Sequence, residues 1–486
     1  MDNDIISFLD FNPNDEIEIL DIYISGLTKY IEIRRKLIPT FCPLCGQRMH
    51  SKGIYKRHIN HPILQDGYNI VIILHQRRWR CTNQICSYCH NDEFSFVDKG
   101  KQNTYATVYL ILQEMKDLNI TARYIAKKFN VSDTFVHDVF SQYIDCKRLP
   151  LPPILAIDEV MLNFNYKNRY ALVLMNFITG EIVDILPNRY KSDYEKYFYS
   201  IPISERNEVK AIVCDMYNPY VNFSVNYFHK AEVVIDSFHV IQWINHKISI
   251  YINNVKKKYR KKDDERLDEY NFRNNKDYKT IKQSREVYIL NNYKWVILTP
   301  RHRINYSTYK KYNSFFNQYL CTYDYEHYFL SLDSNFELIR DLRDKYVKFN
   351  EDFPKDFDSA TNELNNLIYL YSSSSLEMFR DFAELLKRYH AEICNSFKSM
   401  EYYSNEVYNT TITETAANLR RLSNGPMEGF NRKPKDLKRN SRGFNNIRYT
   451  INRILWSNRD NEPIRLTPLP IEDVKVPGKP RGPYKK

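Results

Sequence analysis

Two acidic residues of the sequence, Asp158 and Asp215, each follow a short run of apolar residues. The runs, residues 154–157 and 209–214, are rich in Ile and Val, which is typical of strands buried on both faces. A carboxylate just past a buried strand lies at the edge of an open α/β sheet, where ligands bind. If the two strands are neighbours, both acids come within reach of one divalent cation. The pattern predicts a metal site at a sheet edge, with Glu159 as the local competitor of Asp158.

A second candidate metal site lies among the five cysteines that precede residue 90. Cys42 and Cys45 have the spacing of a zinc knuckle, in which two thiolates bind one ion. The second pair must come from Cys81, Cys86 and Cys89, and the spacing does not decide which. The total of nine cysteines is odd, and their clustering favours a structural zinc site in a reducing compartment over a disulfide framework. A set of buried cysteines without a ligand is the alternative.

Several elements must position the two acids. Thr179-Gly180 between two apolar stretches predicts a hairpin, because Gly supplies the turn geometry. The order of elements is strand, hairpin, helix, strand, helix, strand, which is the ribonuclease-H-like arrangement, where acids from different elements converge on paired metals. The predicted hairpin covers residues 170–186. A helix follows over residues 192–199, with Ser192 as its N-cap, and a strand over residues 231–235 leads to Asp236.

The region before this stretch is predicted to be helical. Residues 104–118 form one helix, and residues 121–143 have the apolar spacing of a helix-turn-helix, with Thr121 and Ser132 as N-caps. An ordinary helical hairpin is the alternative. In a helix-turn-helix, the side chains presented to DNA would be Thr134, Phe135, His137 and Asp138.

A third acid, Glu428, precedes a basic run. A helix of this composition would direct the acid toward a metal and the basic side chains toward phosphates, whereas an exposed helix of mixed charge is the alternative. Pro434 lies within the run and is expected to kink or end the helix. The basic residues are Arg432, Lys433, Lys435, Lys438, Arg439 and Arg442.

Four ordered motifs give the chain a family resemblance. Residues 156–159, 215–220, 234–240 and 424–431, the last followed by the basic run, resemble motifs of ISL3-family insertion-sequence transposases. The resemblance covers nearly the whole chain. It implies a DNA transposase that binds the terminal inverted repeats of its element and then cuts and rejoins DNA. A transposase-derived DNA-binding regulator and a metal-dependent nuclease are the alternatives.

The resemblance also implies roles for single residues. The DDE triad of the family maps onto Asp158, Asp215 and Glu428, which would hold two Mg²⁺ (or Mn²⁺) ions for phosphoryl transfer. Asp236 and His239 form a D-x-x-H pair with a supporting role, such as helix capping by Asp236. No covalent protein–DNA intermediate is required.

The same resemblance assigns the second cysteine pair to Cys81 and Cys86, with Cys89 as the alternative. Together with Cys42 and Cys45 they would hold one structural Zn²⁺. Contacts to double-stranded DNA, at both the transposon ends and the target, are expected from Thr134, His137, Lys433, Lys435, Lys438 and Arg439.

Composition agrees with this interpretation. The 486 residues carry 71 Lys and Arg against 59 Asp and Glu, a net charge of +12, which favours a polyanionic partner. No apolar run reaches membrane-spanning length, and the N-terminus lacks a basic leader. We therefore expect a cytoplasmic, nucleoid-associated bacterial protein without membrane contact. We also expect it to act as a homo-oligomer on DNA.

We interpret the chain as a multidomain α/β protein with six regions. They are a zinc module (1–100), a helix-turn-helix (101–148), a ribonuclease-H-like core (149–249), an all-α insertion (250–420), the last catalytic helix region (421–460) and a basic tail (461–486).

Overall fold

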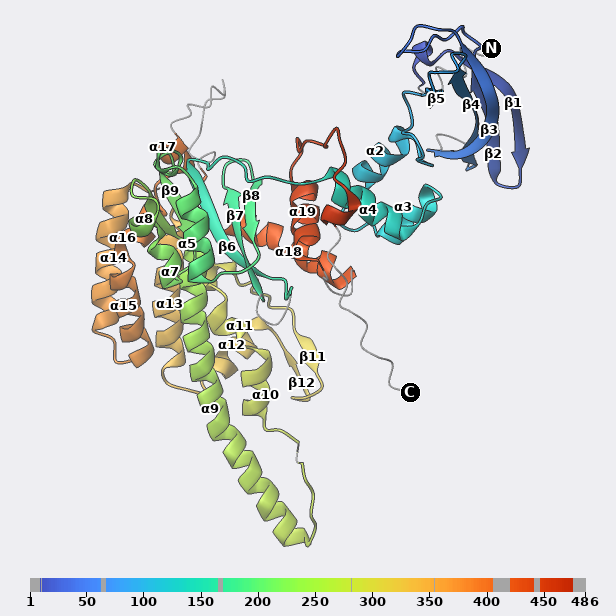
Figure 1. Ribbon diagram of the computed structural model, residues 1–486. Coiled ribbons are helices and arrows are strands. Elements are labelled where there is room, and N and C mark those ends of the chain that lie inside the picture. Colours follow the sequence, from blue (N-terminus) through green and yellow to red (C-terminus); the bar gives the residue numbers. More distant parts are fainter. Residues whose placement is uncertain are drawn as a thin grey trace, which may run out of the picture. The chain divides into compact units, whose positions relative to one another are not determined.

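The computed structural model describes residues 9, 11–62, 67–164, 169–280, 282–353, 355–404, 420–440 and 446–474. The chain divides into two compact units, each with helices and strands (Figure 1). This confirms the predicted mixed α/β, multidomain class. The first unit comprises Met1–Arg148, Met161–Tyr170 and Arg432–Lys486, and the second comprises Leu149–Val160 and Ala171–Asn431.

The first unit contains a five-stranded sheet with the order β1-β2-β4-β3, and β5 also pairs with β4. The first two strands form an antiparallel hairpin, with Gly26 in its turn at a φ of 60°. Alternate apolar side chains of β2 and β4 are buried in one core, as the strand period of two requires. The elements are η1 (Pro13–Asp15), β1 (Ile17–Ser25), β2 (Thr28–Arg35), β3 (Met49–His61), β4 (Asn69–Cys81) and β5 (Cys89–Asn91).

Three helices follow the sheet: α2 (Tyr105–Glu114), α3 (Ala122–Lys128) and α4 (Asp133–Tyr143). The predicted N-caps are confirmed, because Thr121 accepts a hydrogen bond from the backbone N–H of Tyr124 and Ser132 accepts one from Phe135. The helix predicted over 104–118 ends earlier than expected, at Glu114.

The core of these three helices is completed by a segment from the far end of the chain. α19 (Ile447–Asn458) supplies Trp456, which lies in the same buried cluster as Ile111 and Phe140. Further along, before α20 (Ile471–Val474), the N–H of Leu469 donates to the carbonyl oxygen of Gln142. This packing was not predicted, since residues 421–460 were expected to form one region with the last catalytic helix.

The second unit contains a five-stranded sheet with the order β10-β9-β6-β7-β8. The three strands β6, β9 and β10 pair in parallel, whereas β7 and β8 form the predicted antiparallel hairpin. Ser192 is not the N-cap of α5: that position is Tyr190, which makes no side-chain capping bond. The elements are β6 (Ile154–Met161), β7 (Tyr170–Asn176), β8 (Ile182–Leu186), α5 (Lys191–Ser200), α6 (Ile203–Arg206), β9 (Ala211–Cys214), α7 (Asn218–Val221), α8 (Phe223–Asn226) and β10 (Glu232–Ile235).

A largely helical insertion follows β10. It begins with α9 (Ser237–Asn274), whose buried residues Val240, Ile244, Ile248 and Ile252 recur every four positions and form one apolar stripe. The expectation of an all-α insertion is wrong in one respect, because β11 (Lys311–Asn313) and β12 (Gln318–Leu320) pair as a small sheet. The remaining elements are α10 (Arg285–Asn292), α11 (Trp295–Leu298), η2 (Arg301–Arg303), α12 (Thr322–Leu330), α13 (Phe336–Glu351), α14 (Phe357–Ser372), α15 (Glu377–Arg388), α16 (His390–Asn395) and α17 (Met400–Ser404).

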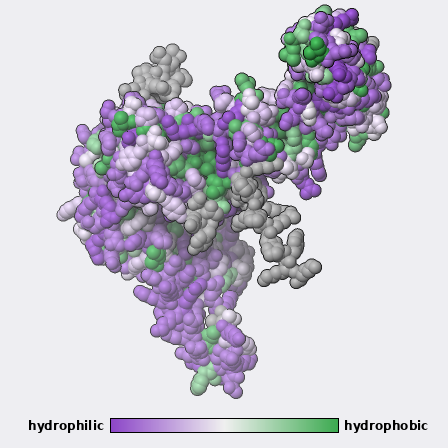
Figure 2. All heavy atoms as spheres, in the orientation of Figure 1, coloured by the Kyte–Doolittle hydropathy of each residue, from purple (hydrophilic) through white to green (hydrophobic). Residues whose placement is uncertain are grey.

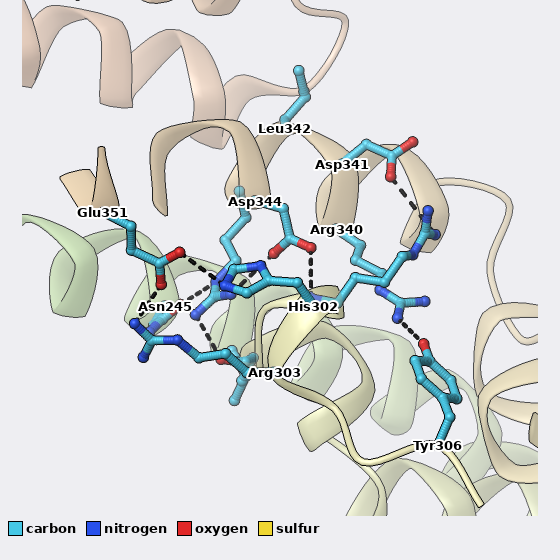
Figure 3. Close-up of polar contacts among 12 residues, drawn as sticks. Asn245, His302, Arg303, Tyr306, Arg340, Asp341, Leu342, Asp344 and Glu351 are labelled. Atoms are coloured by element: carbon cyan, nitrogen blue, oxygen red, sulfur yellow. Dashed lines mark hydrogen bonds and ion pairs between the residues drawn. The ribbon is translucent and has the colours of Figure 1, made fainter. Parts of the chain in front are cut away.

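Polar contacts fix the segment around η2 to α13 (Figure 3). The backbone N–H of Arg301 donates to Asp344 at 3.0 Å, and His302 Nε2 lies 2.8 Å from a carboxylate oxygen of Glu351. The buried Arg340 donates to the Tyr306 hydroxyl at 2.7 Å. These contacts hold an irregular connection in place where apolar packing alone would not fix its path.

The last helix of this region, α18 (Gly425–Asn440), continues through Pro434. Pro434 was expected to kink or end the helix; the helix does not end there, although the proline removes one backbone donor. Hydrophilic residues cover most of the face drawn in Figure 2. No helix among the described residues is long and apolar enough to cross a membrane.

Candidate functional site

The strand register of the second unit aligns three acids. Ala156 pairs with Val213, and Val213 pairs with Val234, so these residues form one row across β6, β9 and β10. Because the strands are parallel, their carboxyl ends lie at the same edge of the sheet. Two positions further along the three chain segments are Asp158, Asp215 and Asp236.

The two predicted strand-end acids differ in their setting. Asp215 directly follows β9, as expected, but β6 continues to Met161, so Asp158 lies inside its strand rather than just past it. The expected position of Asp158 was wrong in this respect because the apolar run ends at Ile157 while the backbone pairing does not. The predicted adjacency of the two strands is confirmed.

The pKa values of Asp158 and Asp215 both lie above the ordinary value of an aspartate. Burial raises the pKa of Asp158 to about 6; the N–H of Glu159 opposes this rise, and the charge of Asp215 adds to it. Burial also raises the pKa of Asp215, against the opposing effect of the N–H of Tyr217. The imidazole of His239 partly offsets the rise for each carboxylate. Two acids held this close in a partly buried edge favour a bound cation over two free charges.

Asp236, His239 and Glu428 form a second, tighter group, in which one ligand atom from each residue lies within 4.8 Å of the others. Asp236 is only 2% exposed and caps α9 by accepting a hydrogen bond from the N–H of Phe238 at 3.1 Å, as suggested by the sequence. Within the described part of the chain, the buried Nε2 of His239 has no hydrogen-bond partner. The triad Asp158, Asp215 and Glu428 does not form an equally tight group among the described residues.

Glu159 has its own partners. Its carboxylate oxygens lie 2.6 and 2.7 Å from the guanidinium of Arg189 and accept a hydrogen bond from the Tyr220 hydroxyl at 2.5 Å. Successive side chains of a strand point to opposite faces, so Glu159 and Asp158 cannot both face the acid row. Glu159 is thus engaged in a local ion pair.

Four of the five clustered cysteines come together in the first unit. One sulfur from each of Cys42, Cys45, Cys81 and Cys86 lies within 4.8 Å of the others, whereas Cys89 is outside the group. The distance Cys42 Sγ to Cys86 Sγ is 3.7 Å, and Cys45 Sγ to Cys81 Sγ is 3.4 Å. Tetrahedral Zn–S bonds of about 2.3 Å place two sulfurs roughly 3.8 Å apart, so the donor set fits zinc. Although burial opposes it, the N–H groups of Leu44 and Cys45 lower the pKa of Cys42 to about 7.

The residues predicted to contact DNA lie on α4 and on the part of α18 that begins at Arg432, both in the first unit. Thr134 and His137 are exposed on α4, and His137 Nδ1 lies 2.8 Å from the Tyr449 hydroxyl of α19. Along α18, Lys433 and Lys435 are exposed, Lys438 is partly buried, and Arg439 is paired with Asp436 at 3.0 Å. Arg442 and the tail from residue 475 lie outside the described residues.

Comparisons with known proteins identify the family. The model of the ISL3-type DDE transposases, described as Transposase, matches residues 155–418 and 406–454, more than half of the chain. The chain belongs to the ISL3 family of transposases. It is also 24% identical over 241 residues to the transposase for insertion sequence element IS1001 of Bordetella parapertussis. The aligned residues cover 47% of this chain and 54% of that protein. The chain spans about half the length of the curated relative it matches.

One polar residue of the ISL3 transposase site was not singled out from the sequence. Asn431, buried on α18, donates from its Nδ2 to Asp158 Oδ2 at 2.8 Å. It stands three positions after Glu428, and residues three apart lie on one face of a helix. This three-residue spacing from Glu428 is the sequence feature from which Asn431 could have been predicted to lie at the site.

Proposed function

We propose that this chain is an active DDE transposase, which binds the terminal inverted repeats of its element and catalyses metal-dependent DNA cleavage and strand transfer. The observation that carries the proposal is uncompensated charge. Among the described residues, no Lys or Arg forms an ion pair with Asp158, Asp215, Asp236 or Glu428, while the neighbouring Glu159 is paired with Arg189. Asp236 is buried and the other three acids are partly buried, and acids removed from water without a paired cation are costly for a fold and mark candidate cation sites.

Asp158, Asp215 and Glu428 are the proposed ligands of Mg²⁺ or Mn²⁺. Hard divalent cations prefer carboxylate oxygens, and such sites are usually completed by water and substrate phosphate. Asp236 is the rival in this row, but its carboxylate already caps α9. Cations bound here would supply the Lewis-acid chemistry that activates the attacking oxygen and stabilises the leaving oxygen. The chain itself orients the three carboxylates, and His239 stands beside them as a supporting residue.

The fold proposed for the second unit is ribonuclease-H-like. Its support is the strand order β10-β9-β6-β7-β8, in which an antiparallel hairpin adjoins three parallel strands. The acids reach one edge of this sheet from β6, from the end of β9 and from α18. In this fold, a largely helical insertion separates the second and third acids of the triad.

Recognition of the transposon ends is proposed for the first unit. α3 and α4 would form a helix-turn-helix with Thr134 and His137 on its exposed side. The four cysteines would hold one structural zinc ion. Lys433, Lys435, Lys438 and Arg439 would contact phosphates, which position DNA without reading its sequence. Assembly of more than one copy on DNA is part of this proposal.

The test uses the full chain and DNA that carries the inverted repeats flanking its gene. Asp158→Asn, Asp215→Asn and Glu428→Gln should each reduce cleavage in magnesium on the order of a thousandfold or more, because charge neutralisation carries most of phosphoryl-transfer catalysis. Glu159→Gln is the matched control and should be far milder. End binding, measured by mobility shift, should survive all four changes.

Other outcomes identify the rival functions. Cleavage without joining would indicate a metal-dependent nuclease. Specific binding by a wild-type chain that never cuts verified ends would indicate a regulator. Should Glu428→Gln cut normally while loss of another acid abolishes cleavage, the third ligand is misassigned.

A further inference from the structure

Asn431 is placed to act on the catalytic site although it carries no charge. It is 5% exposed and lies on α18 with Glu428, one helical turn further along. Its partner Asp158 is 273 residues away in sequence. A buried amide normally satisfies both of its polar atoms, because each unpaired one costs free energy.

The Asp158 carboxylate receives a donor on each oxygen. The backbone N–H of Glu159 donates to Oδ1 at 2.7 Å, and Asn431 Nδ2 donates to Oδ2 at 2.8 Å. Two donors on opposite oxygens stop the carboxylate from rotating about its terminal bond. Each ionised oxygen keeps further acceptor capacity, because a carboxylate has about four lone-pair positions.

The other amide atom of Asn431 is unused. Its Oδ1 is buried and has no hydrogen-bond partner among the residues that the structure describes. The side chain therefore makes one strong contact, a hydrogen bond to an acid, and the orientation of the amide follows from that contact. A residue kept only for packing would not need a buried, half-satisfied amide.

We propose that Asn431 is a positioning residue, which holds the Asp158 carboxylate in the orientation needed to bind a divalent cation. The inference rests on the proposed metal-dependent function and adds to it a residue outside the triad. Residues that orient metal ligands by hydrogen bonding typically change metal affinity or activity about 10- to 100-fold when replaced. Direct ligation by Asn431 Oδ1 is the competing explanation and is treated as an outcome of the test.

Two near-isosteric variants separate these roles. Asn431→Leu removes both the donor and the acceptor while filling the same buried space. Asn431→Asp keeps an oxygen that can bind a cation but replaces the donor to Asp158 with an acceptor. Asn226→Ala, at an exposed position of α8, is the control for loss of an asparagine in the same unit.

The first measurement is binding, with no reaction involved. Mn²⁺ is titrated into the full-length protein and free Mn²⁺ is followed by electron paramagnetic resonance, with circular dichroism melting to verify the fold. Asn431→Leu should weaken Mn²⁺ binding about 10- to 100-fold. The second measurement is the Mg²⁺ concentration for half-maximal cleavage, which should rise for Asn431→Leu and stay unchanged for Asn226→Ala.

The pattern across the variants decides the role. Loss of cleavage in both Asn431 variants supports positioning. Loss in Asn431→Leu with wild-type cleavage in Asn431→Asp overturns it in favour of direct ligation. Wild-type behaviour of both variants overturns it outright. The Asn431 variants are interpreted only if the wild-type chain cleaves DNA and Asp158→Asn does not. A wild-type chain that does not cleave, or an Asp158→Asn variant that does, would contradict the proposed function itself and not the role of Asn431.

Discussion

Trp456 should be essential for the stability of the three helices near the N-terminus. It is 1% exposed, and its indole Nε1–H donates to the carbonyl oxygen of Leu112 at 3.0 Å. That carbonyl lies in the last turn of α2, where its ordinary helical donor, the N–H of Lys116, donates to Gln113 instead. Trp456 therefore both fills the core and satisfies a carbonyl left free at a helix end.

The cost of losing Trp456 follows from these two contributions. Trp456→Ala should destabilise the helices by about 3–5 kcal/mol, the usual range for deleting a buried aromatic side chain. Trp456→Phe keeps most of the volume but leaves the Leu112 carbonyl without its donor, which costs about 1–3 kcal/mol. Arg448→Ala on the same helix removes one of three cations paired with Asp145, from an arginine that is itself exposed, and should cost about 1 kcal/mol or less.

Hydrogen exchange followed by mass spectrometry measures the loss of stability in each helix separately. This suits a chain of several domains, whose global unfolding is not two-state. Peptides covering α2, α3 and α4 should lose protection in the order Trp456→Ala, Trp456→Phe, Arg448→Ala. End binding should weaken in the same order. Unchanged protection of these peptides in Trp456→Ala would refute the reasoning, and a stable, specific DNA-binding fragment that ends near residue 145 would do the same.

Two further predictions concern metal and protons. Cys42→Ser should lower the zinc content from about one ion per chain and loosen the N-terminal sheet, whereas Cys89→Ser should keep its zinc; equal content in both variants, measured by elemental analysis, would exclude the four-cysteine site. The pKa of Asp158 is raised by burial to about 6 from an ordinary 3.8, so the folded state binds this proton more tightly than the unfolded state. Protonation of Asp158 should therefore stabilise the metal-free second unit as the pH falls from about 7 to about 4, by at most about 3 kcal/mol. Asp158→Asn should remove that share and leave the contribution of Asp215, whose pKa is also raised, as measured by hydrogen exchange of peptides from the second unit.

Local structure was largely predictable from the sequence because its signals are local. The hairpin around Gly180 and the N-caps Thr121 and Ser132 follow from residue type and neighbours, and the structure has them. Ser192 failed as a cap because helix starts shift by a residue or two, and α5 already begins at Lys191. Pro434 does not end α18, although a proline inside a helix removes one backbone hydrogen bond.

Long-range partners were not predictable in the same way. Periodicity shows that α19 has a buried face, but it does not show that this face packs on helices more than 300 residues earlier. The contact between Asn431 and Asp158 likewise joins residues far apart in the sequence and could not be predicted from periodicity. The alignment of Asp158 with Asp215 was foreseen in outline, because parallel strands bring their carboxyl ends together whatever their separation in sequence.

The helical insertion has a structural role in the proposed catalytic site. Its hydrophobic core is continuous from Ile235, the last residue of β10, through α9 to Phe397. The buried Asn395 donates to the carbonyl oxygen of Val233 in β10 at 3.0 Å. The Tyr389 hydroxyl donates to the carbonyl oxygen of Met216, just beyond Asp215, at 3.2 Å.

These contacts reach the segments that carry the acids. α9 begins at the Asp236 cap, so the first turn of the insertion shares its polar end with the acid row. Buried carboxylates repel one another, and only rigid packing behind them keeps their geometry fixed before a cation binds. The insertion supplies that packing at β9 and β10, and Asn431 supplies a hydrogen bond at β6. The insertion is thus part of the framework that orients the acids, and changes in its core should affect cleavage before they affect end binding.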